Sequence, residues 1–331
     1  MMKIIIITHA PPGSLKGNRV TALRWARLLR ESGYQVQIGC SYQGASCDVL
    51  IALHARHSFP SIETFYQLHP EKPLIVLLTG TDLYADIQTN SRAARSLEMA
   101  DALVLLQPLG SEELHPSHQQ KARVIYQSAA AVRNPPPKRK RTFDVCVVGH
   151  LRDVKDPFRA GLAARLLPAA SAIRIIHVGQ ALADNFEKAA LQEMRENPRY
   201  SWIGKTPRWQ TRKILSASRA MVLSSKTEGG ANVISEAVVA GVPVLASRIP
   251  GSVGLLGERY TGYFPVGDTE TLAALLRKLE TDALFLKQLS DSCRALAGKF
   301  HPDKEKMVLV DMIKELIASK KAGDRVRFKG E

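Results

Sequence analysis

The chain has 331 residues, more than the roughly 100–200 of an ordinary single domain, so we expect two domains. Apolar residues make up 45% of it and charged residues 23%, which excludes a disordered chain. No apolar run approaches the ~18 residues of a transmembrane helix or the pattern of a signal peptide. We therefore expect a cytoplasmic protein without stable membrane insertion.

The net charge of +15 favours an anionic partner. Its densest basic run, 138–141, follows three prolines at 135–137, which is typical of a solvated linker, so we expect no nucleic-acid partner. The cysteines show neither a CxxC pair nor metal-ligand spacing, so no metal site or disulfide framework is predicted. They are Cys40, Cys47, Cys146 and Cys293.

Short β-branched strands alternate with helical stretches through the first half of the chain. They are expected at Lys3–Thr8, Gln35–Cys40, Asp48–Leu53, Pro73–Thr79, Ala102–Leu106 and Arg123–Gln127. This alternation predicts a parallel sheet covered by helices. The clearest helix should run from Asn18, a good N-cap, to Glu31. Its apolar spacing predicts a buried face at Val20, Leu23 and Leu28.

The same pattern restarts after a basic, proline-rich linker at 135–142. Strands are expected at Phe143–Val148, Arg174–Val178, Arg219–Leu223 and Pro243–Ala246. We expect one domain at 1–134, a second at 143–300, and a C-terminal helix and tail at 301–331. The predicted fold class is therefore α/β, with two Rossmann-like, doubly wound parallel sheets. If they face each other, a central cleft forms where such folds bind ligands.

The strongest motif lies at 227–237 and contains two glutamates, Glu228 and Glu236. A glycine-containing turn lets the backbone approach a ligand closely, and a helix beginning at Ala231 or Asn232 presents free N–H groups to an anion. Glu236 should lie about one turn into that helix and point back toward the same ligand. Two solvated glutamates at a helix end are the alternative interpretation.

This segment resembles the paired-glutamate motif of retaining GT-B glycosyltransferases, family four in particular. The resemblance implies that Glu236 binds the ribose hydroxyls of a nucleoside diphosphate and that Glu228 faces the donor sugar as a catalytic residue. A carboxylate suits ribose because it accepts from two vicinal hydroxyls. Backbone contacts to the donor are expected from Gly229, Gly230, Ala231, Asn232 and Val233.

A second motif is a strand that ends in Gly149 and is followed by two cations, Arg152 and Lys155. In the family an arginine directly follows such a glycine and a lysine comes later in the loop, and both hold the donor diphosphate. Lys155 matches that lysine, while His150 stands in place of the arginine, so we assign the second catalytic cation to Arg152. Both would stabilise the departing β-phosphate. The alternative is that the two cations pair with neighbouring surface aspartates.

A basic, glycine-containing loop joins the first strand to the first helix and resembles the N-terminal glycine loop of GT-B enzymes, which helps to hold the acceptor. It matches neither a Walker loop nor a dinucleotide fingerprint. Two further polar segments, at 53–57 and 78–84, follow predicted strands, and a His or Asp there could bind or deprotonate an acceptor. Acceptor contacts are expected from Gly13, Lys16, Gly17, Asn18, Arg19, His54, Arg56, Thr81 and Asp82.

A narrower resemblance covers nearly the whole chain. The segments 11–26, 52–56, 78–84 and 149–152 together resemble the selenosugar synthases of selenoneine biosynthesis. This implies transfer of N-acetylglucosamine from UDP-N-acetylglucosamine to selenophosphate, with formation of a carbon–selenium bond and release of UDP and phosphate. Lys16, Arg19 and Arg56 suit a small anionic acceptor. Selenium is already nucleophilic, so the scheme needs no general base, cofactor or metal, although Mg²⁺ is compatible with it.

Two other activities stay open on this fold. One is sugar transfer to a hydroxyl of a lipid, polyol or glycan. A membrane-bound acceptor would favour a basic first helix, and Arg19, Arg24, Arg27 and Arg30 are compatible with that. The other is a UDP-sugar 2-epimerase, which would turn over the sugar nucleotide without an acceptor.

Overall fold

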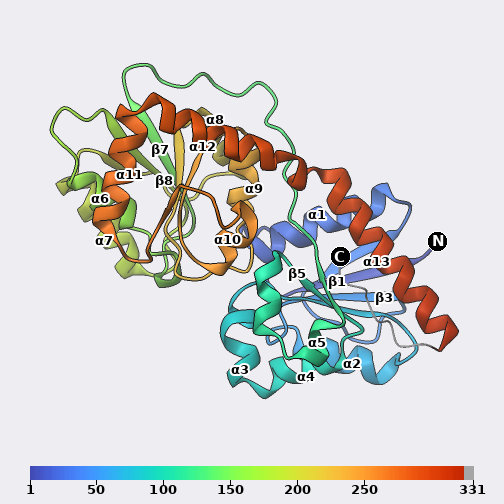
Figure 1. Cartoon of the computed structure of the whole chain (residues 1–331). Coiled ribbons are helices and arrows are strands. Elements are labelled where there is room, and N and C mark those ends of the chain that lie inside the picture. The colour runs from blue at the N-terminus through green and yellow to red at the C-terminus, as the bar shows by residue number, and fades with distance from the viewer. Residues whose placement is uncertain (324–331) are drawn as a thin grey trace. The chain divides into compact units, whose positions relative to one another are not determined.

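The computed structural model describes residues 1–323, and these form two compact units. Unit 1 consists of Met1–Gln127 together with the described chain from His301, and unit 2 is Ser128–Phe300. Each unit contains a six-stranded parallel sheet with helices packed around it (Figure 1). The structure thus confirms the predicted α/β class with two parallel sheets.

The sheet of unit 1 has the order β2-β1-β3-β4-β5-β6. Its strands are β1 (Lys3–Thr8), β2 (Gln35–Gly39), β3 (Val49–Leu53), β4 (Leu74–Leu77), β5 (Ala102–Leu105) and β6 (Ala122–Val124). Because β1 pairs with β2 on one side and β3 on the other, the chain changes direction across the sheet there. Thr8 pairs with Leu53, so the loops after β1 and β3 leave the sheet side by side at this switch point.

Helices cover both faces of the sheet of unit 1. Ile4 and Ile6 of β1 pack with α1 (Gly17–Glu31) and α13 (Pro302–Ala322). Ile5 and Ile7 face the opposite core, which includes residues of α2 (Phe59–Leu68) and α4 (Ser91–Met99). The shorter elements are the π-helix η1 (Asp82–Asp86), α3 (Ile87–Thr89), the 3₁₀-helix η2 (Pro108–Glu113) and α5 (Pro116–Gln119). Ile4 to Ile7 are all buried, as a strand of a sheet covered on both faces requires.

The start and buried face of α1 differ from the sequence prediction. Lys16, not Asn18, is its N-cap residue. The side chain of Asn18 instead donates to Thr79 Oγ1 at 3.4 Å, which ties the helix start to the loop after β4. Leu23 is 50% exposed rather than buried, and the fully buried Trp25 lies at the centre of the packed face. The reason is α13, which packs along α1 and sets the face that is covered.

Arg24 is buried between α1 and α13. Its Nε donates to both carboxylate oxygens of Glu305, at 2.9 and 3.0 Å, and its Nη2 donates to Gln127 Oε1 at 2.8 Å. A buried charge needs such a partner, so this arginine serves helix packing. Arg24 therefore cannot belong to the basic membrane-facing surface that the lipid-acceptor alternative requires.

The sheet of unit 2 has the order β12-β11-β10-β7-β8-β9. Its strands are β7 (Phe143–Val148), β8 (Ile173–Val178), β9 (Tyr200–Trp202), β10 (Ala220–Leu223), β11 (Val244–Ser247) and β12 (Tyr263–Phe264). β7 pairs with β8 on one side and with β10 on the other. The switch point therefore lies between β7 and β10, where Val147 pairs with Val222 near the ends of both strands.

The helices of unit 2 are η3 (Asp153–Lys155), α6 (Arg159–Arg165), α7 (Asp184–Glu196), α8 (Arg208–Ala217), α9 (Asn232–Val239), α10 (Pro250–Leu256), α11 (Thr269–Thr281), α12 (Ala283–Leu296) and η4 (Ala297–Phe300). α11 packs on α6 and α12 on α9, whereas α13 packs on α1 of unit 1. The C-terminal helices are thus divided between the two units. Within residues 1–323, no helix combines the length and apolar character needed to cross a membrane.

The division between the units falls at Gln127, before the boundary expected at 134. The segment that follows is held by unit 2. The N–H of Ala129 donates to Phe300 O at 3.1 Å, and Arg212 Nη2 donates to Ala130 O. Composition predicted the linker at the prolines, but the chain already contacts unit 2 at residues before them.

Candidate functional site

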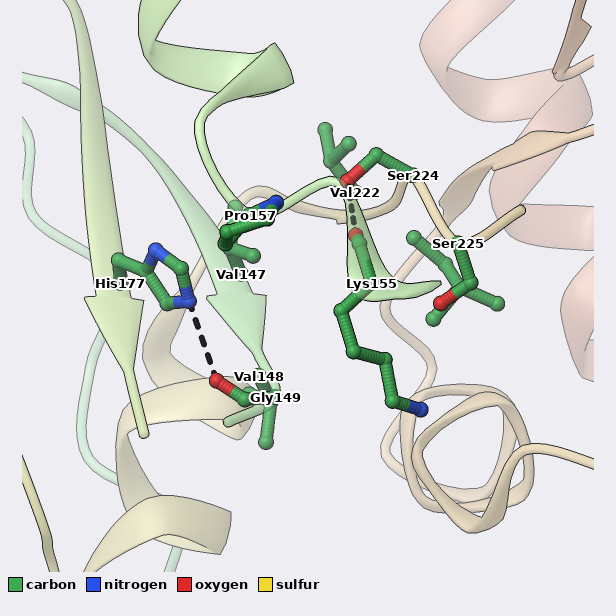
Figure 2. A pocket seen from close by; sticks show the side chains of 10 residues that line it. Val147, Val148, Gly149, Lys155, Pro157, His177, Val222, Ser224 and Ser225 are labelled. Carbon is green, nitrogen blue, oxygen red and sulfur yellow. Dashed lines mark hydrogen bonds between the residues drawn. The ribbon is translucent and has the colours of Figure 1, made fainter. Parts of the chain in front are cut away.

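A small pocket lies at the carboxyl ends of β7 and β10, at the switch point of unit 2 (Figure 2). It is lined by Val147, Val148, Gly149, Lys155, Pro157, His177, Val222, Leu223, Ser224 and Ser225. Doubly wound folds bind ligands at this position because two neighbouring loops diverge there. Gly149 and Lys155, predicted from sequence, lie together in it.

The loop after β7 brings Lys155 to Glu228 of the loop after β10. Lys155 Nζ donates to Glu228 Oε1, and the hydroxyl of Ser225 donates to the same oxygen at 2.6 Å. The Glu228 side chain is 12% exposed and that of Lys155 22%, so the pair is largely shielded from water. An ammonium group and a carboxylate side by side suit a ligand that presents an anion next to hydroxyl groups.

The two loops are fixed to each other by further hydrogen bonds. The Ser224 hydroxyl lies 2.9 Å from Asp156 O and 3.1 Å from Lys155 O. The N–H of Lys226 donates to Val154 O at 2.8 Å. These bonds hold the Lys155 backbone in place, so a bound anion would meet a preorganised cation.

α10 approaches the Glu228 loop so closely that a glycine is required. A Cβ added at Gly251 would lie 2.0 Å from Glu228 O. The hydroxyl of Ser247 at the end of β11 donates to Ser225 O at 2.5 Å. The backbone that carries Glu228 is therefore packed against α10 and the end of β11, and it has little freedom to move.

The end of β7 is positioned by a buried histidine that the sequence did not indicate. His177 of β8 contacts Gly149 O through Nε2 at 3.1 Å (Figure 2). Its Nδ1 lies 2.8 Å from the Tyr200 hydroxyl. Burial lowers the pKa of His177 to about 4. The ring is therefore neutral at neutral pH, with Nε2 donating to the carbonyl and Nδ1 accepting from the tyrosine.

His177 gives a testable pH dependence of stability. Its pKa is about 4 in the folded chain against 6.5 ordinarily, so the unfolded chain binds a proton first as the pH falls below 6.5. At about 1.4 kcal/mol per pH unit, this one group should cost roughly 2 kcal/mol of unfolding free energy between pH 7 and 5. In His177→Gln, urea unfolding at the two pH values should show a loss smaller by about that amount. An equal loss in both proteins would contradict the assignment.

The other two residues expected at the diphosphate lie at the same edge. Arg152 is exposed just before η3, and within residues 1–323 its side chain has no ion-pair partner. His150 Nδ1 accepts from the N–H of Gln180 at 3.2 Å, so this nitrogen is already used to join the loops after β7 and β8. The geometry favours Arg152 over His150 as the second cation.

Glu236 lies on α9, which begins at Asn232 with Ala231 as its N-cap residue, as expected. The side chain of Glu236 is 9% exposed and is paired with an arginine that the sequence did not indicate. Arg208 of α8 donates to Glu236 Oε1 from Nη2 at 2.7 Å and from Nε at 3.2 Å. A ligand that used this carboxylate would have to share it with the 40% exposed Arg208 or displace it. The loop residues Gly229 and Gly230 precede the same helix, and Val233 is its second residue.

The residues expected at the acceptor lie on unit 1. His54 follows β3, and its Nε2 lies 3.0 Å from Oγ1 of Thr81, which follows β4. Arg56 pairs with Asp86 of η1 at 3.0 Å. Lys16 is exposed, and Gly13 takes a positive φ of 78° in the turn that precedes it. Gly17 is the first residue of α1, where Asn18 and the half-buried Arg19 follow.

Asp82 has a structural role that replaces the acceptor-binding role expected for it. The residue is completely buried, and its carboxylate accepts from the N–H groups of Ala55, Thr79 and Gly80 at 2.8–3.0 Å. It therefore joins the loops after β3 and β4. A carboxylate that is saturated in this way is not available to deprotonate an acceptor.

The expected donor residues thus all belong to unit 2 and the expected acceptor residues to unit 1. Within the described part of the chain, no group of three or more His, Cys, Asp or Glu residues is placed to hold a metal ion. No contact was predicted from the sequence for His9, Asp86, His177 or Arg208, and His57 was included only as part of the polar segment 53–57. For His9 and His57 a signal existed, because each comes just after a predicted strand.

Comparison with known protein families gives a match that covers most of unit 2. The family model of the glycosyl transferases group 1 matches residues 129–296, more than half of the chain. No curated protein matches the sequence.

Solved structures resemble the chain over nearly its whole length. A crystal structure of HepE from Anabaena in complex with UDP and glucose has a TM-score of 0.75 at 15% identity, covering 95% of this chain and 100% of that one. Sucrose-phosphate synthase from Thermosynechococcus elongatus has a TM-score of 0.77 at 14% identity, covering 96% and 100%. A trehalose-6-phosphate protein from E. coli, bound with UDP-2-fluoro glucose, has 0.72 at 10% identity, covering 95% and 99%. At such identities the likeness shows the fold, which is GT-B.

Proposed function

Because the chain belongs to the glycosyl transferases group 1 family, we propose that it is a retaining-type transferase moving N-acetylglucosamine from UDP-N-acetylglucosamine to selenophosphate. Glycosyl transfer follows from the family itself. The sugar, the stereochemical outcome and the selenium acceptor are our proposal, based on the resemblance of segments 11–26, 52–56, 78–84 and 149–152 to selenosugar synthases.

The observation that carries the donor part is the contact of Lys155 with Glu228 at the switch point of unit 2. The diphosphate of the donor would draw on Lys155, Arg152 and the N–H groups at the start of α9. Glu228 would accept from hydroxyls of the sugar. The ribose hydroxyls would bind Glu236, for which Arg208 is the present partner.

In the proposed reaction the carbon–oxygen bond to UDP breaks through an oxocarbenium-like state, and the selenium of selenophosphate attacks the anomeric carbon on the face that UDP leaves, as retention requires. The electron pair of that bond leaves with UDP, where Lys155 and Arg152 meet the charge that develops on the β-phosphate. Water then cleaves the phosphorus–selenium bond, which releases phosphate and leaves the selenol on the sugar. Every charge in this scheme is met by side chains or amides, so we propose no cofactor or metal.

The acceptor part is supported by the cations of unit 1. Lys16 is exposed at the N-cap of α1, and Arg56 is 42% exposed beside Asp86. A trianionic or dianionic acceptor suits such a surface, whereas a neutral hydroxyl acceptor makes no use of it.

The test is to incubate the full chain with UDP-N-acetylglucosamine, with and without fresh selenophosphate under anaerobic reducing conditions. We expect UDP release that depends on selenophosphate and a sugar product with the selenium isotope pattern. Inorganic phosphate in place of selenophosphate is the matched control. Conversion of the UDP-sugar into its 2-epimer without any acceptor would favour the epimerase alternative, and UDP release only with hydroxyl acceptors would overturn the selenium assignment.

A further inference from the structure

Three histidine rings converge at the switch point of unit 1. His9 is the first residue after β1, while His54 and His57 belong to the loop after β3. The ring centroids of His54 and His57 lie 4.2 Å apart, those of His9 and His57 4.5 Å, and those of His9 and His54 5.5 Å. The register explains this, because His9 and His54 follow the paired residues Thr8 and Leu53.

The backbone of His54 is strained. Its φ of +82° is uncommon for a residue with a Cβ and costs on the order of 1–3 kcal/mol. The ring is held by the N–H of His57, which donates to Nδ1 at 3.4 Å, and by Thr81 Oγ1 at 3.0 Å from Nε2. Strain of this kind is kept where the surrounding structure imposes a geometry, and it is concentrated at functional sites.

Polar atoms around the rings lack partners in the described chain. His9 Nδ1 and Asp86 Oδ2 are both buried without a hydrogen bond. The same Asp86 oxygen lies 3.9 Å from His54 Nε2. Buried polar groups without partners are rare in proteins, and two in one place point to a missing ligand or proton.

Charged groups of both signs face the histidines. They belong to Lys16, His54, Arg56, Asp82 and Asp86. Asp82 accepts from backbone N–H groups and Asp86 Oδ1 pairs with Arg56, so Lys16 is the cation of this group without an ion-pair partner among the described residues. Burial, reinforced by the neighbouring imidazoles, lowers the pKa of His9 to about 4 and lowers the pKa of His57 as well. Both rings are therefore mainly neutral at neutral pH, and each can take up a proton if an anion arrives.

We propose that His9 and His57 form a proton-coupled site for a tetrahedral oxyanion, with His57 as the exposed ring that the anion reaches. The proposal rests on the proposed function and deepens it, since it assigns the phosphate group of the acceptor to these two residues. An adjacent dianion stabilises the imidazolium form, so binding of the anion draws a proton onto the pair. By linkage, affinity then rises as the pH falls.

The experiment is a calorimetric titration of sulfate into the full chain, in buffers of different ionisation heat and at several pH values from about 6 to 8. Sulfate keeps its two charges throughout this range, so any proton uptake belongs to the protein. We expect net proton uptake on binding, with affinity falling by up to about tenfold for each pH unit raised. The binding should persist with saturating UDP, because the oxyanion is that of the acceptor.

The variant His57→Gln should lose the proton uptake and bind sulfate about tenfold more weakly. His118→Gln is the matched control, because His118 of α5 also has a pKa lowered by burial but lies outside the cluster. It should behave as the unchanged protein does. UDP affinity, measured in parallel, shows whether each variant is folded and whether the donor site of unit 2 is intact.

Four outcomes would overturn the inference: no sulfate binding, binding without proton uptake, unaltered binding by His57→Gln, or displacement of sulfate by UDP. The last would assign the oxyanion to the donor diphosphate. Any of these together with transfer to selenophosphate would reject the histidine site and keep the proposed function. Proton-coupled sulfate binding without transfer to selenophosphate would keep the histidine site and reject the proposed function.

Discussion

Lys155→Met is expected to lower kcat with the UDP-sugar about 10²–10³-fold, the usual effect of removing one preorganised group that stabilises charge in the transition state. The lysine is fixed by Ser224 through its backbone and directed by Glu228. The attraction between Lys155 and the leaving β-phosphate increases as the bond to the sugar breaks, so the variant should change kcat more than KM. Steady-state UDP release measures both constants.

The matched control is Lys226→Met, in the loop after β10. Lys226 is exposed, and its backbone N–H, which the substitution keeps, makes the bond to Val154 O. This variant should retain nearly full activity. Equal losses in both lysine variants would mean that general positive charge, rather than the position of Lys155, supports turnover.

A double variant separates folding from chemistry at this pair. Lys155→Met alone leaves the shielded Glu228 carboxylate with only Ser225 among its present partners, and should lower the unfolding free energy by about 1–3 kcal/mol. Adding Glu228→Gln removes the unpaired charge and should restore much of that stability, while activity stays low. Recovery of activity together with stability would show that the loss in the single variant was only a folding defect.

Glu236→Ala is expected to weaken UDP binding roughly 10–100-fold, which corresponds to about 1.5–3 kcal/mol for hydrogen bonds to a charged group. The carboxylate is 9% exposed about one turn into α9, so it can accept from ribose hydroxyls in a site with little competing water. Titration calorimetry with UDP gives the affinity without requiring any acceptor.

Glu258→Ala is the control for this second prediction. Glu258 is an exposed glutamate of the same unit that is also paired with an arginine, Arg248, at 2.7 Å. Its removal should leave UDP affinity unchanged. If both glutamate variants bind UDP normally, the ribose does not lie at Glu236.

The fold could be predicted where burial is encoded locally. β1 and β7 have the bounds expected from their β-branched runs, because a strand covered on both faces reads as continuous apolar sequence. The face of α1 could not be predicted in the same way. Its partner is α13, which is remote in sequence, and only that contact explains why Leu23 is exposed while Trp25 and Arg24 are buried.

The same distinction holds for the site. Gly149, Lys155 and Glu228 could be named because each belongs to a short motif at the end of a strand. Arg208 and His177 reach the site from α8 and β8, and only the folded sheet brings them to Glu236 and Gly149. Their contacts depend on distances between segments that are remote in sequence, and the spacing of residues along the chain does not predict these distances.

The most direct test of the donor site is a crystal structure of the chain with UDP. We expect the diphosphate within hydrogen-bond distance of Lys155 Nζ and of the N–H groups at the start of α9. The ribose hydroxyls should lie on the Glu236 carboxylate, with its bonds to Arg208 shared or broken. UDP bound away from the ends of β7 and β10, or a ribose without contact to Glu236, would contradict the account.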